Sequence, residues 1–141
     1  MALDHGTKRL GIAFCDALEI LASPFEVWPM EGDATLERLA RLARAEGAEA
    51  LLVGLPRHHD GNPSATAPLA QAFGEALAAR TGLPLTFLDE HLTSAEAERL
   101  LAQRGVKPKD RKAKLDAASA AVLLQAHLED RSARQVPRDQ P

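Results

Sequence analysis

Two short hydrophobic runs constrain the fold more than any other feature of this sequence. Residues 50–53 form the first run and residues 84–88 the second. Short, almost wholly apolar segments are typical of strands buried on both faces of a parallel sheet. A helical pattern over residues 64–80 separates the two runs. Because parallel strands need a crossover to connect them, this order predicts an α/β fold.

The first part of the chain predicts three strands in a meander, followed by a helix. Residues 1–4 form a short strand, and a glycine turn leads into a second strand over residues 9–16. Residues 20–28 predict a third strand, placed towards an edge because Pro24 cannot donate a hydrogen bond to a neighbouring strand. A helical period over residues 35–46 follows.

Three further helices are predicted in the rest of the chain. Ser64 can cap a helix that ends near residue 80. The capping box that begins at Thr93 starts a second helix, which Gly105 ends. The last helix is predicted over residues 115–129, where small alanines let backbone approach backbone.

These elements predict a five-stranded mixed β-sheet with helices on both faces. Right-handed crossovers place the strand at residues 50–53 beside the first strand, and the strand at residues 84–88 beyond it. We expect one domain over residues 1–130. Residues 131–141 show no periodicity and are predicted to be a disordered tail.

Composition and charge narrow the class of protein. The chain has 141 residues and 45% hydrophobic content, enough for one core without metals or disulfides. The charged residue Asp4 comes before any apolar segment of a signal peptide, and no apolar run is long enough to span a membrane. We therefore expect a soluble cytoplasmic protein with no membrane contact. The single cysteine, Cys15, is expected to be a buried hydrophobe. The net charge of −3 argues against a general nucleic-acid coat.

A basic run departs from this acidic balance. Residues 104–114 contain six basic residues and one acid. We expect a solvated loop here, with contact to phosphates as the alternative.

Three carboxylates are candidates for a shared site. Asp4 ends the first strand, Glu90 ends the last one, and Asp116 begins the last helix. The carboxyl ends of parallel strands meet at one edge of a sheet, where ligands bind. Clustered carboxylates favour Mg²⁺ or Mn²⁺, and two such ions suit phosphodiester cleavage. A helix-dipole role is an alternative explanation of Asp116.

Other candidates are weaker. His58, His59 and Asp60 look like metal ligands, but adjacent histidines in a loop usually point apart, so we expect a solvated or substrate-contacting loop. Trp28 is expected to be structural. With one tryptophan and no tyrosine, an aromatic platform for stacking bases is poorly supported.

Four ordered motifs resemble those of the YqgF/RuvX family, which is similar to the RuvC Holliday junction resolvases and has an RNase H-like fold. The motifs are Asp4-x-Gly6-Thr7-Lys8-Arg9-Leu10-Gly11, Val53-Gly54-Leu55-Pro56 with Asp60-Gly61, Asp89-Glu90-x-Leu92-Thr93-Ser94-x-x-Ala97, and Asp116-Ala117-Ala118. The family usually has arginine where this chain has His91. Its first strand is also longer, so we expect that the true start lies upstream or has been trimmed.

The resemblance implies a metal-dependent nuclease that acts on precursor 16S rRNA or on branched DNA, as a monomer or a homodimer. It implies Asp4, Glu90 and Asp116 as the catalytic and metal-binding acids, with Mg²⁺ or Mn²⁺. The residues expected to contact the substrate are Lys8, Arg9, Arg57, His91, Lys112 and Lys114.

Two rival functions remain open at this point. An ATPase of the actin and sugar-kinase type uses a similar Asp-x-Gly-Thr turn, but needs a second domain that 141 residues do not supply. A binding adaptor for RNA or a transcription factor could keep the fold and lose catalysis. Substitution of a core acid would mark that loss, and none is substituted.

Overall fold

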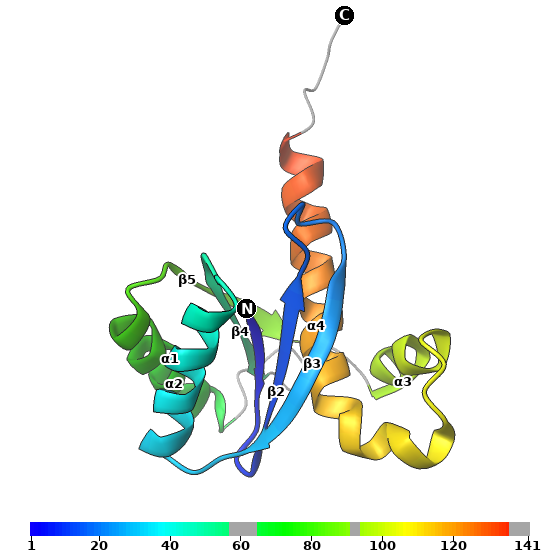
Figure 1. Ribbon diagram of the computed structural model, residues 1–141, viewed down its shortest axis with the longest axis horizontal. Coiled ribbons are helices and arrows are strands. Elements are labelled where there is room, and N and C mark those ends of the chain that lie inside the picture. Colours follow the sequence, from blue (N-terminus) through cyan, green and yellow to red (C-terminus); the bar gives the residue numbers. More distant parts are fainter. Residues whose placement is uncertain (57–64, 91–93, 136–141) are drawn as a thin grey trace, which may run out of the picture.

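The computed structural model describes residues 1–56, 65–90 and 94–135, which form one sheet flanked by helices (Figure 1). The strands are β1 (Ala2–His5), β2 (Arg9–Cys15), β3 (Ala22–Pro29), β4 (Leu51–Pro56) and β5 (Leu85–Glu90). The helices are α1 (Asp33–Ala45), α2 (Ala67–Thr81), α3 (Ser94–Gln103) and α4 (Pro108–Gln135). The predicted α/β class and five-stranded sheet are confirmed.

The strand order is β3-β2-β1-β4-β5, as the crossover rule predicted. Strands β1, β2 and β3 pair antiparallel, whereas β4 pairs parallel with both β1 and β5. The turn between β1 and β2 is closed by the Gly6 amide, which donates to the Arg9 carbonyl at 2.9 Å. Strand β3, which contains Pro24, is at the predicted edge.

Helices cover both faces of the sheet, and alternation along each strand divides the core between them (Figure 1). On one face, Leu3 packs with leucines of α1 and α2. On the other face, Ala2 packs with Ala120, Ala121 and Leu124 of α4. Helix α3 packs against α4 through Ala97, Leu101 and Ala118. Ala2 and Leu3, which are adjacent on β1, therefore point to opposite faces of the sheet.

Helix α4 touches the sheet backbone to backbone at Gly11. A Cβ atom added to Gly11 would lie 2.0 Å from the Asp116 carbonyl oxygen. Ala117 and Ala118, which follow Asp116, are buried. Gly11 has no side chain, and Ala117 and Ala118 have small ones. The backbone of α4 can therefore lie directly against the backbone of β2.

The predicted start of the last helix is wrong. Helix α4 begins at Pro108, so most of the basic run expected to be a loop is helical. Proline suits the first turn of a helix, and the lysines, arginine and alanine that follow are good helix formers. Asp116 lies more than two turns inside α4, so the helix-dipole explanation for it does not apply.

The predicted end of the same helix is also too early. Helix α4 continues to Gln135, through residues expected to belong to the tail. Arg131 lies 3.4 Å from Glu19, and Arg134 pairs with Asp130 one turn before it at 3.2 Å. Residues 136–141 lie outside the described residues.

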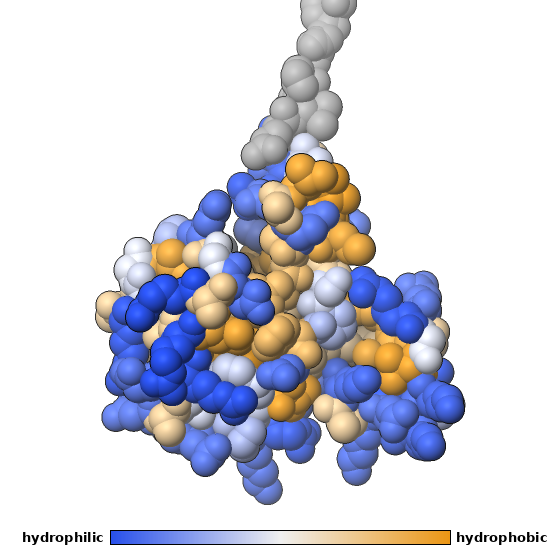
Figure 2. Space-filling view, in the orientation of Figure 1, coloured by the Kyte–Doolittle hydropathy of each residue, from blue (hydrophilic) through white to orange (hydrophobic). Residues whose placement is uncertain are grey.

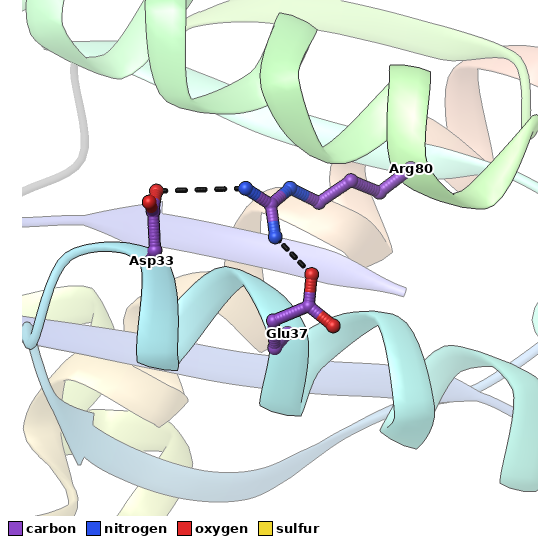
Figure 3. Close-up of polar contacts among 3 residues, drawn as sticks. All are labelled: Asp33, Glu37 and Arg80. Carbon is purple, nitrogen blue, oxygen red and sulfur yellow. Dashed lines mark hydrogen bonds and ion pairs between the residues drawn. The ribbon is translucent and has the colours of Figure 1, made fainter.

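Helix α2 begins at Ala67, later than expected, while Ser64 and Thr93, the two expected caps, lie outside the described residues. Arg80 of α2 pairs with Glu37 and Asp33 of α1 (Figure 3). Exposed pairs of this kind contribute little stability, at most about 1 kcal/mol. The apolar contacts between the helices and the sheet contribute more.

Two surface properties of the described residues complete the fold. None of the described helices is both long enough and apolar enough to cross a membrane. Hydrophobic side chains gather over the connection between β2 and β3 (Figure 2), where Leu18, Ile20 and Leu21 are exposed.

We expect a Gly11→Ala variant to lose about 3 kcal/mol or more of folding free energy, because its methyl group would collide with backbone atoms of α4 that cannot rotate away. Chemical denaturation measures the loss. Gly47→Ala is the matched control: nothing lies near its added Cβ, and only its positive φ opposes alanine, at about 1–2 kcal/mol. Equal losses in the two variants would contradict the close contact.

Candidate functional site

Asp4 lies near the end of β1, on the face of the sheet that α4 covers. Ala2, two residues earlier on the strand, packs against α4, and alternation gives Asp4 the same face. The cross-strand partner of Asp4 on β2 is Gly11. Gly11, which allows the close approach of α4 to the sheet, is therefore the direct neighbour of Asp4.

Asp116 reaches the same place from α4. Its own carbonyl group is the one that lies against Gly11. The close approach of α4 to β2 therefore places the two acids beside each other, although more than a hundred residues separate them in the sequence. Both residues are half-buried.

Asp4 and Asp116 line one pocket of about 260 Å³. The other lining residues all come from the turn between β1 and β2 and the start of β2: Gly6, Thr7, Lys8 and Arg9. The turn therefore contributes two cations and a hydroxyl to a pocket with two carboxylates. The structure therefore brings Asp4, Asp116, Lys8 and Arg9 together in one pocket, and their roles there stay a prediction.

Arg9 and Asp116 are joined directly across this pocket. The Arg9 Nε donates a hydrogen bond to the Asp116 Oδ2 at 2.8 Å. That hydrogen bond, together with the carboxylate charge, raises the pKa of the Arg9 guanidinium above its usual value. Arg9 is exposed, so it can exchange this carboxylate for another anion without unfolding any element.

Glu90 is the last residue of β5 and lies opposite Pro56 of β4. Strand β5 is two strands from β1 in the parallel part of the sheet, so their backbones are about 10 Å apart. The register aligns Leu3 with Val53 and Val53 with Phe87, so Glu90 lies further along the sheet than Asp4. The side chain of Glu90 is outside the described residues.

The remaining predicted substrate contacts divide into two groups. Arg57 and His91 lie outside the described residues, as do His58, His59 and Asp60. Lys112 and Lys114 are exposed on α4 within the two turns before Asp116. Since residues four apart share a helix face, Lys112 is on the same side of α4 as Asp116.

Sequence reasoning did not single out His5, which borders the site from the other face of the sheet. Its ring contacts Phe73 of α2, with 5.0 Å between ring centroids. Its buried Nδ1 has no hydrogen-bond partner among the described residues, and burial lowers the pKa of the imidazole. Nothing in the sequence distinguishes it from an ordinary histidine at a strand end.

The arrangement can bind a cation and an anion side by side. Carboxylate oxygens are ligands for hard divalent ions, and the adjacent lysine and arginine suit phosphate oxygens. Among the side chains that the structure describes, no three Asp, Glu, His or Cys residues form a metal-binding group. The two acids in the pocket can hold a divalent ion whose other ligands are waters, a further carboxylate or substrate oxygens.

Comparisons with known proteins identify the family of this chain. The family model described as "RuvX: Holliday junction resolvase" matches residues 1–130. A protein of Lactococcus lactis subsp. cremoris (strain MG1363), named "Putative pre-16S rRNA nuclease", is 36% identical over 92% of each chain. A protein of the same name from Burkholderia vietnamiensis (strain G4 / LMG 22486) is 38% identical over 94% of this chain and 89% of its own length.

The fold also resembles a solved structure, that of Thermus thermophilus RuvC in complex with a Holliday junction substrate. The TM-score is 0.54 at 15% sequence identity, over 94% of each chain. At this identity the likeness concerns the fold alone, and it agrees with the RNase H-like architecture. On the match to the family model and the identity to the curated relatives, this chain belongs to the RuvX family.

Proposed function

We propose that this chain is a metal-dependent endonuclease that hydrolyses phosphodiester bonds in structured nucleic acid. The observation that carries the proposal is the pocket where Asp4 and Asp116 lie beside Lys8 and Arg9. Acids that bind hard divalent ions and cations that bind phosphate are the two components that such a reaction needs. The names of the relatives and the description of the family both refer to nucleases or resolvases, which supports the same reaction.

Each residue has a distinct role in this proposal. Asp4, Glu90 and Asp116 hold the ions, and Glu90 is included because β5 ends at the same edge of the sheet as β1. Mg²⁺ or Mn²⁺ held by these acids would supply Lewis-acid chemistry for hydrolysis, which is a more acidic water and charge stabilisation at the leaving oxygen.

The basic residues orient the nucleic acid backbone. In this proposal, Lys8 and Arg9 contact the phosphate next to the bond that is cut. Lys112 and Lys114, which precede Asp116 on α4, extend the positive surface, and Arg57 and His91 are proposed to add further contacts. The family usually has arginine at the position of His91. Because a histidine titrates near neutral pH, the proposed contact of His91 with the substrate would depend on pH.

Precursor 16S rRNA is the substrate that we propose, with its 5′ end as the expected place of cleavage, because the relatives carry the name "Putative pre-16S rRNA nuclease". That activity would place the protein in the cytoplasm with the ribosomes. The second candidate is a four-way DNA junction, which the family description favours. Paired incisions in a junction would require a homodimer, whereas cutting a single RNA strand needs only a monomer.

A binding adaptor without catalysis would have no use for the pocket acids. Both described acids of the proposed set are present and face the same pocket. Neutralising either one should therefore abolish cleavage and leave the fold intact.

We expect Asp4→Asn and Asp116→Asn each to lower the Mn²⁺-dependent cleavage rate at least 100-fold, because each removes a carboxylate charge at almost constant volume. Single-turnover cleavage of end-labelled substrate measures the effect. Glu96→Gln, an exposed acid on α3, is the matched control and should cleave normally. Cleavage by the Asp4→Asn protein at the wild-type rate would refute the assignment.

A side-by-side assay separates the two candidate substrates. A 5′-extended 16S rRNA fragment and a synthetic four-way junction are incubated with the wild type and with Asp116→Asn. The proposal expects Asp116-dependent cleavage of the RNA at its mature 5′ end. Cleavage of the junction alone would assign the chain as a resolvase, and binding without cleavage of either would favour the adaptor.

The ion pair predicts an effect on metal affinity. Since the Arg9 guanidinium occupies an oxygen of Asp116, we expect Arg9→Gln to bind Mn²⁺ up to about five-fold more tightly, the range for an exposed ion pair. Electron paramagnetic resonance of free Mn²⁺ measures the affinity. Lys8→Gln removes an equal charge from the pocket and leaves the ion pair intact, so its effect should be smaller. Unchanged affinity in Arg9→Gln would show that the ion pair does not compete with the metal.

A further inference from the structure

A second and larger cavity lies next to the proposed catalytic pocket, along the outer edge of the sheet. This groove has a volume of about 670 Å³ and runs along residues 24–29 of β3, the outermost of the described strands on that side. Arg38 of α1 borders it on one side, and α4 and the end of α3 border it on the other. Its walls include Phe25, Val27 and Val106, which are apolar.

The groove and the proposed catalytic pocket are neighbours in two places. Pro29, which lines the groove, is the cross-strand partner of Arg9, which lines the pocket. Lys114 and Ala117, which also line the groove, stand on either side of Asp116 along α4. The groove and the pocket are therefore lined by neighbouring residues of β2 and β3 and of α4.

The charge of the groove is opposite to that of the whole chain. Three cations line it, Arg38, Arg104 and Lys114, against one acid, Glu26, although the net charge of the protein is −3. The Glu26 carboxylate accepts a hydrogen bond from the Trp28 indole at 2.8 Å. The groove thus suits a flexible polyanion better than a neutral or basic ligand.

Two of the three cations, Arg38 and Arg104, are held in place before any ligand arrives. The Arg38 guanidinium carbon lies 3.8 Å from the centroid of the Trp28 ring, which is itself buried. Arg104 donates to the Ala22 carbonyl at 3.0 Å and to the Ser23 hydroxyl at 3.3 Å. Arg38 remains exposed to solvent, so a flat, positively charged surface on a rigid support faces the groove.

These properties favour an unpaired strand over a duplex. Unpaired bases stack on guanidinium planes and contact apolar walls, whereas the bases of a duplex are already stacked on each other. The cavity volume is within the range of pockets that hold a small ligand, so an unpaired nucleotide fits it.

We propose that this groove binds an unpaired segment of the nucleic acid substrate, next to the bond that is cut. A base stacks on Arg38, and the neighbouring phosphate faces Lys114. This proposal rests on the nuclease function proposed above and adds a preference for substrates with a single-stranded flank.

The only tryptophan of the chain gives a direct test, because Trp28 lines the groove. The full-length Asp4→Asn protein, which cannot cleave, is titrated with a duplex that carries a single-stranded overhang and with a blunt duplex of the same length. We expect saturable quenching of Trp28 emission by the overhang substrate and little change with the blunt one. An unchanged emission at saturating overhang substrate would overturn the proposal.

Substitutions of Arg38 and Lys114 test whether the cations of the groove bind the overhang. Arg38→Gln in the same background should weaken overhang binding about ten-fold and leave blunt-duplex binding unchanged, since stacking of one base is lost. Arg38→Lys keeps the charge but lacks the plane, so it should weaken binding as well. Arg41→Gln on the exposed side of α1 is the matched control. Lys114→Gln, measured by anisotropy, provides a second test if loss of Arg38 disturbs Trp28.

The outcomes also separate this proposal from the nuclease function. Asp4-dependent cleavage with no effect of Arg38 or Lys114 on overhang binding would refute the groove and leave the nuclease function standing. Failure to cleave any substrate would refute the nuclease function itself. Quenching by an acidic peptide, such as oligoglutamate, and not by the oligonucleotide would overturn the proposal in favour of a protein partner.

Discussion

The contact between α4 and β2 at Gly11 is the constraint on which the site depends. Neither acid of the pocket is placed by a loop: Asp4 belongs to β1, and Asp116 belongs to a helix that rests directly on the neighbouring strand. Rigid elements hold catalytic side chains more accurately than loops do. The same contact that seals one face of the core therefore sets the distance between the two carboxylates.

The two faces of the sheet are packed for different purposes. Leucines and Phe73 fill the face under α1 and α2, and this larger apolar core contributes most of the burial that stabilises the fold. The face under α4 is rich in alanine and brings helix and sheet backbones together. Because small side chains bury little surface, packing on that face contributes less hydrophobic stabilisation. The same small side chains allow Asp4 and Asp116 to lie close together.

The sequence allowed the strand order to be predicted, because short apolar runs separated by helical patterns permit few topologies. It did not allow the start of α4 to be predicted, since Pro108 and the charges after it look equally like a loop. The meeting of Asp4 with Asp116 was expected from the parallel strand ends and the family motifs. The Arg9–Asp116 hydrogen bond and the groove beside Trp28 were not expected, because both depend on helix packing between distant segments that no local pattern encodes.

The distance along the chain between the partners of the pocket has a consequence for the protein during its synthesis. Arg9 and Asp116 are 107 positions apart, and domains emerge from the ribosome with the N-terminal part first. Until α4 has emerged and docked onto β2, Asp4 and Asp116 are apart and the pocket that both residues line does not exist. The pocket is therefore completed by the last of the described elements to leave the ribosome.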